Sequence, residues 1–266
     1  MLPANYPIES LQMYAFSWQF DGKCGYVKAG DCIFKVCKDK IEKECWGREG
    51  DLEKVLGLHE DHGEFIEMAK DDPLLRCVVE RYPGLRPRTL SLKEAIVIAV
   101  AQQNASFKQA WGNVYRLYRT ISVKYKAFGR EYLSLGEVDE NALRRCGFGY
   151  RAKTIMEALR QNIDCSNIEE LLRVKGIGKY TFALVKMFSC RDYSELPLDR
   201  WLERVAEKAY GDWRRLEEFG RWKGLAALLI TVALDALPLR KALKRVEEGK
   251  VCPSESFSPM TMWQYW

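Results

Sequence analysis

The spacing of apolar and polar positions changes once along the chain. In residues 1–57, short runs of aromatic and β-branched residues alternate with turn residues, most clearly over 13–20 and 25–37. This alternation predicts short strands. Over residues 58–266 the apolar positions recur at helical spacing instead. We therefore expect a mostly α protein with a small N-terminal antiparallel β domain (1–57), followed by a helical domain (58–266).

The strongest single helix signal lies near the middle of the chain. Ser91 is a good N-cap residue and Glu94 follows three residues later, which is the pattern of a capping box. The helix that they begin, Leu92–Ala101, is apolar nearly all round and should be buried in the core. Residues 111–124 then continue as an amphipathic helix. Further helices are predicted over 200–210, 213–219 and 239–250.

Residues 168–189 contain two short helices joined by glycines. Apolar residues recur at helical spacing on both sides of the joint, at Ile168, Leu171 and Leu172 and again at Phe182, Val185 and Phe188. Between them, Gly176-Ile177-Gly178 allows a tight turn and leaves no side chain over the first N–H groups of the second helix. Those N–H groups, with Lys175 and Lys179 beside them, suit a phosphate.

The net charge is small but unevenly distributed. The 266 residues include 42 basic and 37 acidic groups, a balance of +5 that indicates no particular partner. Residues 141–190 hold nine basic and four acidic groups and carry +5 alone. This is the footprint of a nucleic-acid contact, although a solvated helix face has the same composition. The longest apolar runs, 96–101 and 225–234, are too short to span a bilayer and no leader opens the chain, so we expect a soluble intracellular protein.

About twenty residues beyond the glycine joint, the loop Leu196-Pro197-Leu198 ends in Asp199. A glycine hairpin followed by such a loop resembles the signature of the helix-hairpin-helix superfamily of base-excision DNA glycosylases. Gly147-Phe-Gly-Tyr-Arg-Ala-Lys resembles a motif of the 8-oxoguanine and alkylbase branches. Pro83-Gly-Leu-Arg resembles the alkylbase glycosylases, and the alkylbase branch is the closer of the two. The resemblance implies two helical lobes with a cleft, and a monomer that acts on double-stranded DNA containing a damaged base.

The resemblance assigns the chemistry to Asp199. Cleavage of an N-glycosidic bond builds positive charge on the deoxyribose, so a carboxylate is needed near the sugar. The alternative role of Asp199 is N-cap of the next helix, and both roles can coexist because a capping carboxylate is held in place. Relatives that also cut the strand have a lysine where this chain has Tyr180. A phenol cannot form a Schiff base, so we predict a monofunctional hydrolase.

Aromatic residues near the site should stack on the extruded base. Tyr180 and Trp201 are the best candidates, with Trp222 behind them, because an electron-poor alkylated purine is attracted to aromatic faces. The aromatic tail, 251–266, could be docked, disordered or part of this pocket. By the same resemblance, the N-terminal domain is structural and carries no chemistry.

The resemblance also implies DNA contacts. Gln103, with Asn104 next to it, stands where relatives place a residue that fills the gap left by the extruded nucleotide; the alternative is that these amides cap a helix end. Arg151 can reach phosphate or the next helix. The predicted DNA-binding residues are Gln103, Asn104, Arg151, Lys175, Gly176, Ile177, Gly178 and Lys179.

No cofactor is predicted to be required. The main-chain carbonyls of Leu172, Val174 and Ile177 match positions that hold a monovalent cation, sodium or potassium, in related hairpins. Some relatives bind an iron–sulfur cluster on four C-terminal cysteines. Only Cys252 follows Asp199 in this chain, so we do not expect such a cluster.

Nine cysteines are many for an intracellular protein. The spacings of Cys24, Cys32, Cys37 and Cys45 fit neither a zinc ribbon nor a cluster site. Buried free thiols are therefore predicted, with disulfides expected only if the source is a hyperthermophile. His59 and His62 are expected to be exposed and lack a third ligand, so no metal is predicted there.

The sequence thus predicts a glycosylase that hydrolyses an alkylated or deaminated purine from DNA. One alternative is an 8-oxoguanine glycosylase with lyase activity through another lysine. The other is a non-catalytic module that binds damaged DNA through the hairpin. The identity of the lesion depends on pocket residues that are distant in sequence.

Overall fold

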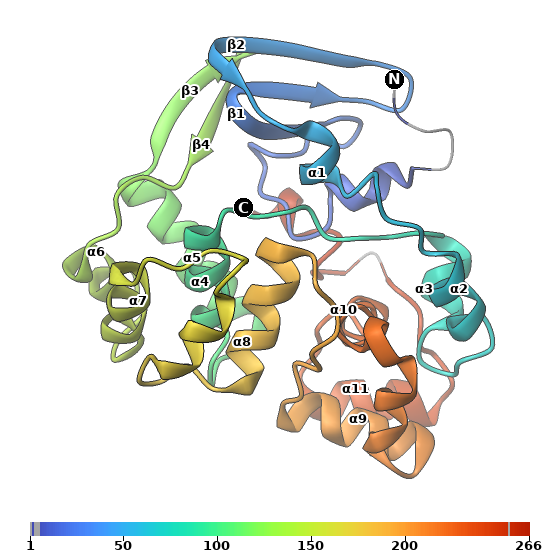
Figure 1. The fold of residues 1–266 in the computed structure, drawn as a ribbon. Coiled ribbons are helices and arrows are strands. Elements are labelled where there is room, and N and C mark those ends of the chain that lie inside the picture. Colours follow the sequence, from blue (N-terminus) through green and yellow to red (C-terminus); the bar gives the residue numbers. More distant parts are fainter. Residues whose placement is uncertain (1, 3–5, 255) are drawn as a thin grey trace.

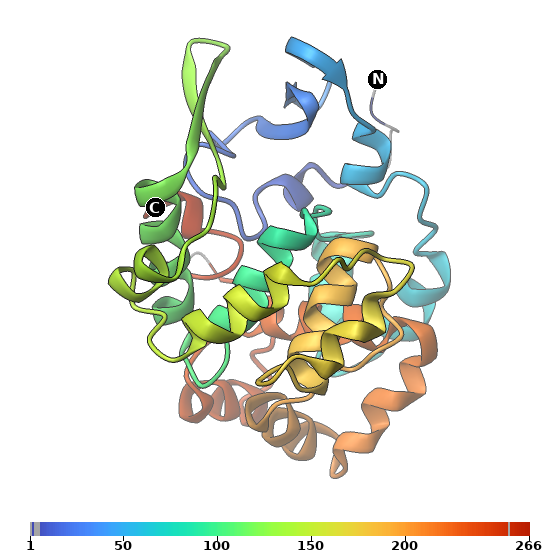
Figure 2. The same ribbon diagram turned by 60° about the vertical axis from the view of Figure 1, so that its left-hand side comes forward.

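The computed structural model describes residues 2, 6–254 and 256–266 (Figure 1). Its two β-hairpins lie together at one end, and the helices occupy the rest of the molecule (Figures 1 and 2). The mostly helical fold with small antiparallel sheets is as predicted. In the described residues, no helix is long and apolar enough to cross a membrane.

The first hairpin consists of the antiparallel strands β1 (Gly25–Val36) and β2 (Ile41–Glu49). The predicted strand over 13–20 was wrong, because these residues form turns and pair with β1 only through one isolated bridge. Their aromatic side chains, including Phe16 and Trp18, pack into the helical core instead. The alternation of this segment therefore reflects burial without a strand partner.

A second hairpin, β3 (Val123–Ala127) and β4 (Arg130–Ser134), lies beside the first and was not predicted. The helix expected over 111–124 is α5 (Phe107–Ile121), which starts and ends earlier because Val123 already belongs to β3. Trp46 and Tyr125 stack across the two hairpins with ring centroids 4.4 Å apart. This contact joins the N-terminal residues to the helical part of the chain.

The first helical lobe is built around α4 (Leu92–Ala101). Ser91 and Glu94 form the expected capping box, and α4 is buried from Ala95 to Ala101. Its apolar surface packs mainly against three other helices, which explains why no polar face appears in its sequence. These neighbours are α5, α7 (Arg151–Arg160) and α8 (Lys179–Val185), and α6 (Glu140–Arg145) and the 3-10 helix η2 (Ile168–Arg173) complete the lobe.

The second lobe combines the C-terminal helices with two helices from the first third of the chain (Figure 2). The predicted helix over 200–210 is confirmed, whereas the one over 239–250 ends earlier, at Glu247. The members are α2 (Gly63–Ala69), α3 (Arg76–Arg81), α9 (Arg200–Tyr210), the 3-10 segment η4 (Trp213–Trp222), α10 (Lys223–Ala233) and α11 (Leu239–Glu247), while the short α1 (Leu52–Leu56) follows β2.

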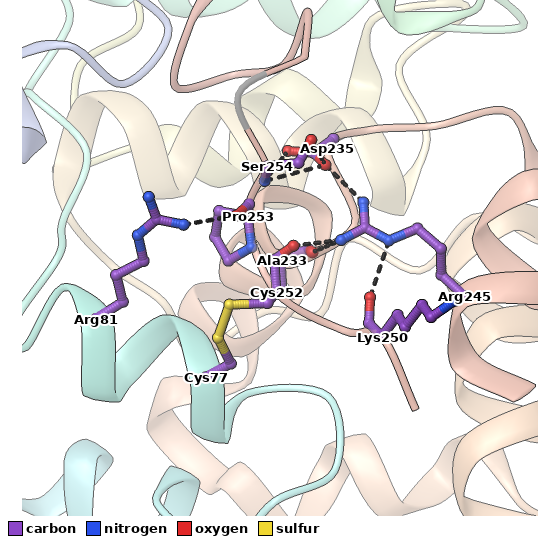
Figure 3. Close-up of a disulfide and its surroundings, with 9 residues drawn as sticks. All are labelled: Cys77, Arg81, Ala233, Asp235, Arg245, Lys250, Cys252, Pro253 and Ser254. Atoms are coloured by element: carbon purple, nitrogen blue, oxygen red, sulfur yellow. Dashed lines mark hydrogen bonds and ion pairs between the residues drawn. A yellow bond between two sulfur atoms is a disulfide. The ribbon is translucent and has the colours of Figure 1, made fainter. Parts of the chain in front are cut away.

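Eight of the nine cysteines are paired, so the prediction of free thiols was wrong. The bridges are Cys24–Cys37, Cys32–Cys45, Cys77–Cys252 and Cys165–Cys190. Only Cys146 is a free, buried thiol. Figure 3 shows that the Cys77–Cys252 bridge joins α3 to the start of the tail. Close to it, the buried Asp235 pairs with Arg245 and accepts hydrogen bonds from Ser254, which fixes the tail a second time.

The aromatic tail is docked, which was one of its three alternatives. The Trp266 ring stacks on Tyr115 of α5, and the carbonyl of Trp266 accepts a 2.6 Å hydrogen bond from the Ser17 N–H. Trp263 meets Phe20 edge to face. The tail therefore connects the N-terminal segment to the first helical lobe.

Candidate active site

The hairpin has the geometry that its glycines predict. The chain leaves η2 at Arg173, turns through Gly176 and enters α8 at Lys179. Gly176 has a φ of +93°, and a Cβ there would lie 2.6 Å from Oγ1 of Thr154, so both the turn and the contact require glycine. Among the described residues no side chain caps the start of α8 at Gly178, and no atom lies within 4 Å of where a Gly178 Cβ would be.

Asp199 is the N-cap of α9. Its Oδ1 accepts a 2.8 Å hydrogen bond from the Leu202 N–H, which fixes the carboxylate at the start of the helix. Asp199 is an exposed residue and lines the open groove described below. Burial on its other sides raises its pKa, although the backbone N–H groups of the first turn oppose this shift. The group is therefore a better proton acceptor than an ordinary surface aspartate.

Two hollows meet at Asp199. A deep cavity of about 630 Å³ lies between the two lobes and is largely apolar. A wider surface groove of about 1100 Å³ runs past the hairpin and includes Lys175, Gly176 and Gly178. Both hollows are lined by Asp199, Tyr180 and Trp201. These three residues therefore stand where a group leaving the groove would enter the cavity.

Tyr180 and Trp201 are both fixed in this boundary. The Trp201 indole Nε1 donates a 2.8 Å hydrogen bond to the carbonyl of Leu237. Burial raises the pKa of Tyr180, and the nearby Asp199 and Tyr14 raise it further, so the phenol stays neutral. Two aromatic residues and one carboxylate thus line the same space, and their role as a base pocket stays a prediction.

Trp222, the third predicted pocket residue, lies elsewhere. It stacks on Tyr193 with ring centroids 5.8 Å apart, and its Nε1 donates to Glu64. Trp222 lines neither the deep cavity nor the groove, so its assignment to the base pocket was wrong. The reason is its position at the end of η4, which faces α2.

The region around Trp222 also corrects the prediction for one of the two histidines, since His59 is exposed as expected and His62 is not. His62 is buried and not exposed, and its ring lies 2.9 Å from Oε2 of Glu60. Glu60 also accepts 2.6 Å hydrogen bonds from Nε and Nη2 of Arg191. Burial opposes ionisation of Glu60, but hydrogen bonds from His62 and Arg191 lower its pKa to about 2. This network joins the residues before α2 to Arg191, which follows the helical segment after the hairpin. In the described chain, no group of three metal-ligating side chains occurs.

Gln103 joins the end of α4 to the hairpin. Its amide nitrogen donates 2.8 Å hydrogen bonds to the Gly176 carbonyl and to Oγ1 of Thr181. The neighbouring Asn104 is exposed, has a left-handed backbone (φ +48°) and donates to the hydroxyl of Tyr150. Tyr150 is itself 65% exposed at the edge of the groove. The Gln103 amide is therefore occupied, and Asn104 and Tyr150 are the side chains presented to solvent.

Arg151 does not face the groove. It is 6% exposed and donates to the carbonyls of Ala101 and Gln103, at 2.8 and 2.9 Å. These carbonyls end α4, so Arg151 satisfies the C-terminal acceptors of the central helix. Its assignment as a DNA-binding residue was wrong, and the alternative contact with a neighbouring helix is the one observed.

Several lysines lie at the walls of the two hollows. Lys153 and Lys175 line the groove and Lys108 lines the cavity. Lys179 is exposed and lines neither hollow, so its contact with DNA stays a prediction. In the hairpin, the Val174 carbonyl accepts the Ile177 N–H at 3.0 Å, so one of its two lone pairs is used within the turn.

No protein-family model and no curated protein matches the sequence. Solved structures match its fold. A 3-methyladenine DNA glycosylase from Archaeoglobus fulgidus superposes with a TM-score of 0.67 at 18% identity, covering 86% of this chain and 94% of the other. An 8-oxoguanine glycosylase/lyase from Clostridium acetobutylicum, in complex with double-stranded DNA, superposes with a TM-score of 0.60 at 17% identity, covering 93% and 92%. The chain has the helix-hairpin-helix DNA glycosylase fold.

Within this glycosylase fold, four aromatic residues of the cavity were not predicted from the sequence, and one of them is Phe188, in the π-helical segment Lys186–Cys190 that follows α8. Tyr14 comes from the N-terminal segment, Phe107 from the start of α5 and Phe257 from the tail. The tail therefore does reach the cavity, through Phe257, as well as being docked. Only the tail gave a signal in the sequence, through its density of aromatic residues, because Tyr14 and Phe107 have no distinguishing neighbours.

Proposed function

We propose that the protein is a base-excision DNA glycosylase that extrudes a damaged base and hydrolyses its N-glycosidic bond, with an alkylated or deaminated purine as the favoured substrate. The observation that carries this proposal is the shared boundary of Asp199, Tyr180 and Trp201 between the groove and the aromatic cavity. The fold, common to DNA glycosylases, supports it.

In the proposed reaction, a purine enters the cavity and its deoxyribose stays at the boundary beside Asp199. The carboxylate stabilises the positive charge that develops on the sugar as the bond to the base breaks. It also accepts a proton from the water whose oxygen bonds to the anomeric carbon. The products are the free base and an abasic site, with the water divided between them.

The groove is the proposed DNA surface. Lys153 and Lys175 provide positive charge for phosphates, and the hairpin turn at Gly176 allows the backbone to approach closely. Asn104 and the exposed Tyr150 lie at the groove where a gap in the base stack would open. They are better placed to fill it than Gln103, whose amide is held by the hairpin.

A monovalent cation is proposed at the hairpin carbonyls of Leu172, Val174 and Ile177. Main-chain oxygens are ligands that suit sodium or potassium, and the Val174 carbonyl has one lone pair left after its bond within the turn. Such an ion would add positive charge next to a phosphate. It would serve DNA binding and take no part in bond cleavage.

The proposed enzyme is monofunctional because Tyr180 stands at the lysine position of strand-cutting relatives. The rival is an 8-oxoguanine glycosylase/lyase, the activity named for one structure of this fold. Lys108 or Lys175 would then have to attack the sugar. Borohydride added during turnover separates the two, because a covalent protein–DNA adduct forms only from a Schiff base.

The deciding experiment compares Asp199→Asn with Asp139→Asn. Asp139 caps α6 through a 2.8 Å bond to the N–H three residues on, the same bond that Asp199 makes at α9, but it lies outside both hollows. Duplexes with different lesions are incubated with each protein and then heated in alkali. We expect only Asp199→Asn to abolish base release, with DNA affinity retained. Retained turnover would remove Asp199 from the mechanism.

A non-catalytic DNA-binding module is the alternative from another class. It predicts lesion-dependent binding without base release by the unmodified protein in the same assay.

With DNA as its substrate, the protein is proposed to act inside the cell as a monomer. Sedimentation of the protein with and without duplex DNA tests the monomer.

A further inference from the structure

Tyr14 occupies an unusual position in the wall of the deep cavity. It belongs to the N-terminal segment, outside any helix or strand, and has a φ of +54°. A non-glycine residue in this region is strained by about 1 kcal/mol or more and persists only where its surroundings fix it. Its N–H donates a 2.7 Å bond to the Pro259 carbonyl, and its ring stacks on Trp111 with centroids 5.2 Å apart. The backbone and ring of Tyr14 are thus both held, facing the cavity.

Most polar side chains of the cavity wall are already engaged within the protein. Thr231 bonds to the Ala227 carbonyl, and Trp201 bonds to the Leu237 carbonyl. Asp235 is paired with Arg245. By contrast, the hydroxyls of Tyr14 and Tyr180 make no hydrogen bond to any described residue. The two phenols are therefore available to a ligand, as is Lys108 at the same cavity.

Both phenols are hydrogen-bond donors at neutral pH. Burial raises the pKa of Tyr14, so it does not ionise. Burial also raises the pKa of Tyr180, with further contributions from Asp199 and from Tyr14 itself. Tyr14, Tyr180 and Asp199 all line the same cavity. A base in the cavity would meet two O–H groups and aromatic faces.

We infer that Tyr14, acting with Tyr180, is a specificity-determining residue that donates a hydrogen bond to the 6-oxo group or a ring nitrogen of the extruded purine, and so favours neutral 6-oxopurines such as hypoxanthine. This inference rests on the proposed function. A neutral 6-oxopurine leaves with negative charge, which a donor stabilises. A cationic 3-methylated adenine leaves as a neutral molecule, lacks the 6-oxo acceptor and gains little from a donor.

The test compares Tyr14→Phe with Tyr115→Phe. Tyr115 lies in the same aromatic cluster, against Trp18 and Trp266, but does not line the cavity. Two single-turnover rates are measured: the release of hypoxanthine from duplexes that contain it, and the release of 3-methyladenine from methylated DNA. We expect Tyr14→Phe to slow hypoxanthine release about ten-fold, as loss of one hydrogen bond of about 1.4 kcal/mol would. Release of 3-methyladenine should stay within about two-fold, and Tyr115→Phe should leave both rates unchanged.

Equal hypoxanthine rates for Tyr14→Phe and the unmodified protein would overturn the inference and leave the proposed function intact. Release of 3-methyladenine without hypoxanthine by the unmodified protein would also overturn it. If no base is released at all, the proposed function fails. The inference is then decided by the binding of free hypoxanthine, which is measured by the quenching of tyrosine and tryptophan fluorescence. Binding that is lost in Tyr14→Phe and kept in Asp199→Asn supports it, and an absence of binding to the unmodified protein refutes it.

Discussion

Removal of the Cys77–Cys252 bridge should cause the largest stability loss of any single disulfide deletion. The bridge closes a loop with a sequence separation of 175 residues, from α3 to the tail. In the chain-entropy model, closing a loop of this length in the unfolded chain stabilises the folded state by about 5 kcal/mol. The bridge with the next longest loop, Cys165–Cys190, has a separation of 25, and the same model gives about 3.5 kcal/mol.

The assay is equilibrium unfolding in guanidinium chloride of the unmodified protein and two double variants, Cys77→Ala with Cys252→Ala and Cys165→Ala with Cys190→Ala. All three proteins are measured in oxidising buffer and again with excess reductant. In oxidising buffer the first variant should lose about 1.5 kcal/mol more than the second, since the cross-linked loop is longer. With reductant the three proteins should unfold at similar denaturant concentrations, because every bridge is then open.

Two results would contradict this reasoning. A first variant no less stable than the second would show that loop length does not control the contribution of the bridge. A difference that persists in reductant would show that packing of the cysteine side chains, and not the cross-link, is responsible. The second result would also direct attention to the Asp235–Arg245 and Asp235–Ser254 contacts beside the bridge, which hold the same segment (Figure 3).

Three further predictions concern charged groups. Glu60→Gln should destabilise the protein by about 3 kcal/mol at neutral pH, because it leaves the charge of the buried Arg191 uncompensated. The stability advantage of the unmodified protein should be complete above the ordinary glutamate pKa of 4.5 and should be lost as the pH falls through about 2. Urea unfolding at several pH values checks this. Because burial raises the pKa of Asp199, base release should fall on the acid side at a higher pH than an ordinary aspartate, at 3.8, would give; a single-turnover rate that stays flat to that pH would contradict this. Arg151→Met should cost about 2 kcal/mol of stability by leaving the α4 carbonyls unpaired, yet leave the salt dependence of DNA binding unchanged, whereas Lys175→Ala should reduce the slope of that dependence by about one ion.

The parts of the fold that the sequence predicted well are those determined by neighbours in the chain. The capping box of α4 needs only Ser91 and Glu94, and the hairpin turn needs only its glycines, so both are visible locally. Arg151 and Trp222 were misassigned because their roles depend on which distant surface they meet. An arginine can satisfy helix carbonyls or bind phosphate with the same donors, and nothing within a few residues of Arg151 distinguishes the two.

The prediction for the cysteines failed for a different reason. Free thiols were predicted from an expected intracellular location, because reducing compartments keep cysteines in the thiol form. Spacing alone could not show that Cys77 and Cys252 meet, because the tail is brought back to α3, where Arg81 donates a hydrogen bond to the Pro253 carbonyl. If the proposed intracellular role is right, four bridges match the proteins of hyperthermophiles, which are the recognised exception to that rule.

The N-cap role of Asp199 and its proposed catalytic role reinforce one another. A catalytic carboxylate must keep its position while the sugar beside it changes charge, and a side chain with free rotation would lose entropy to do so. The bond from the Leu202 N–H removes that freedom in advance, at the cost of stabilising the ionised form. Burial beside the aromatic cavity works in the opposite direction and raises the pKa. The balance leaves a carboxylate that is fixed and ionised at neutral pH, yet basic enough to accept a proton from water.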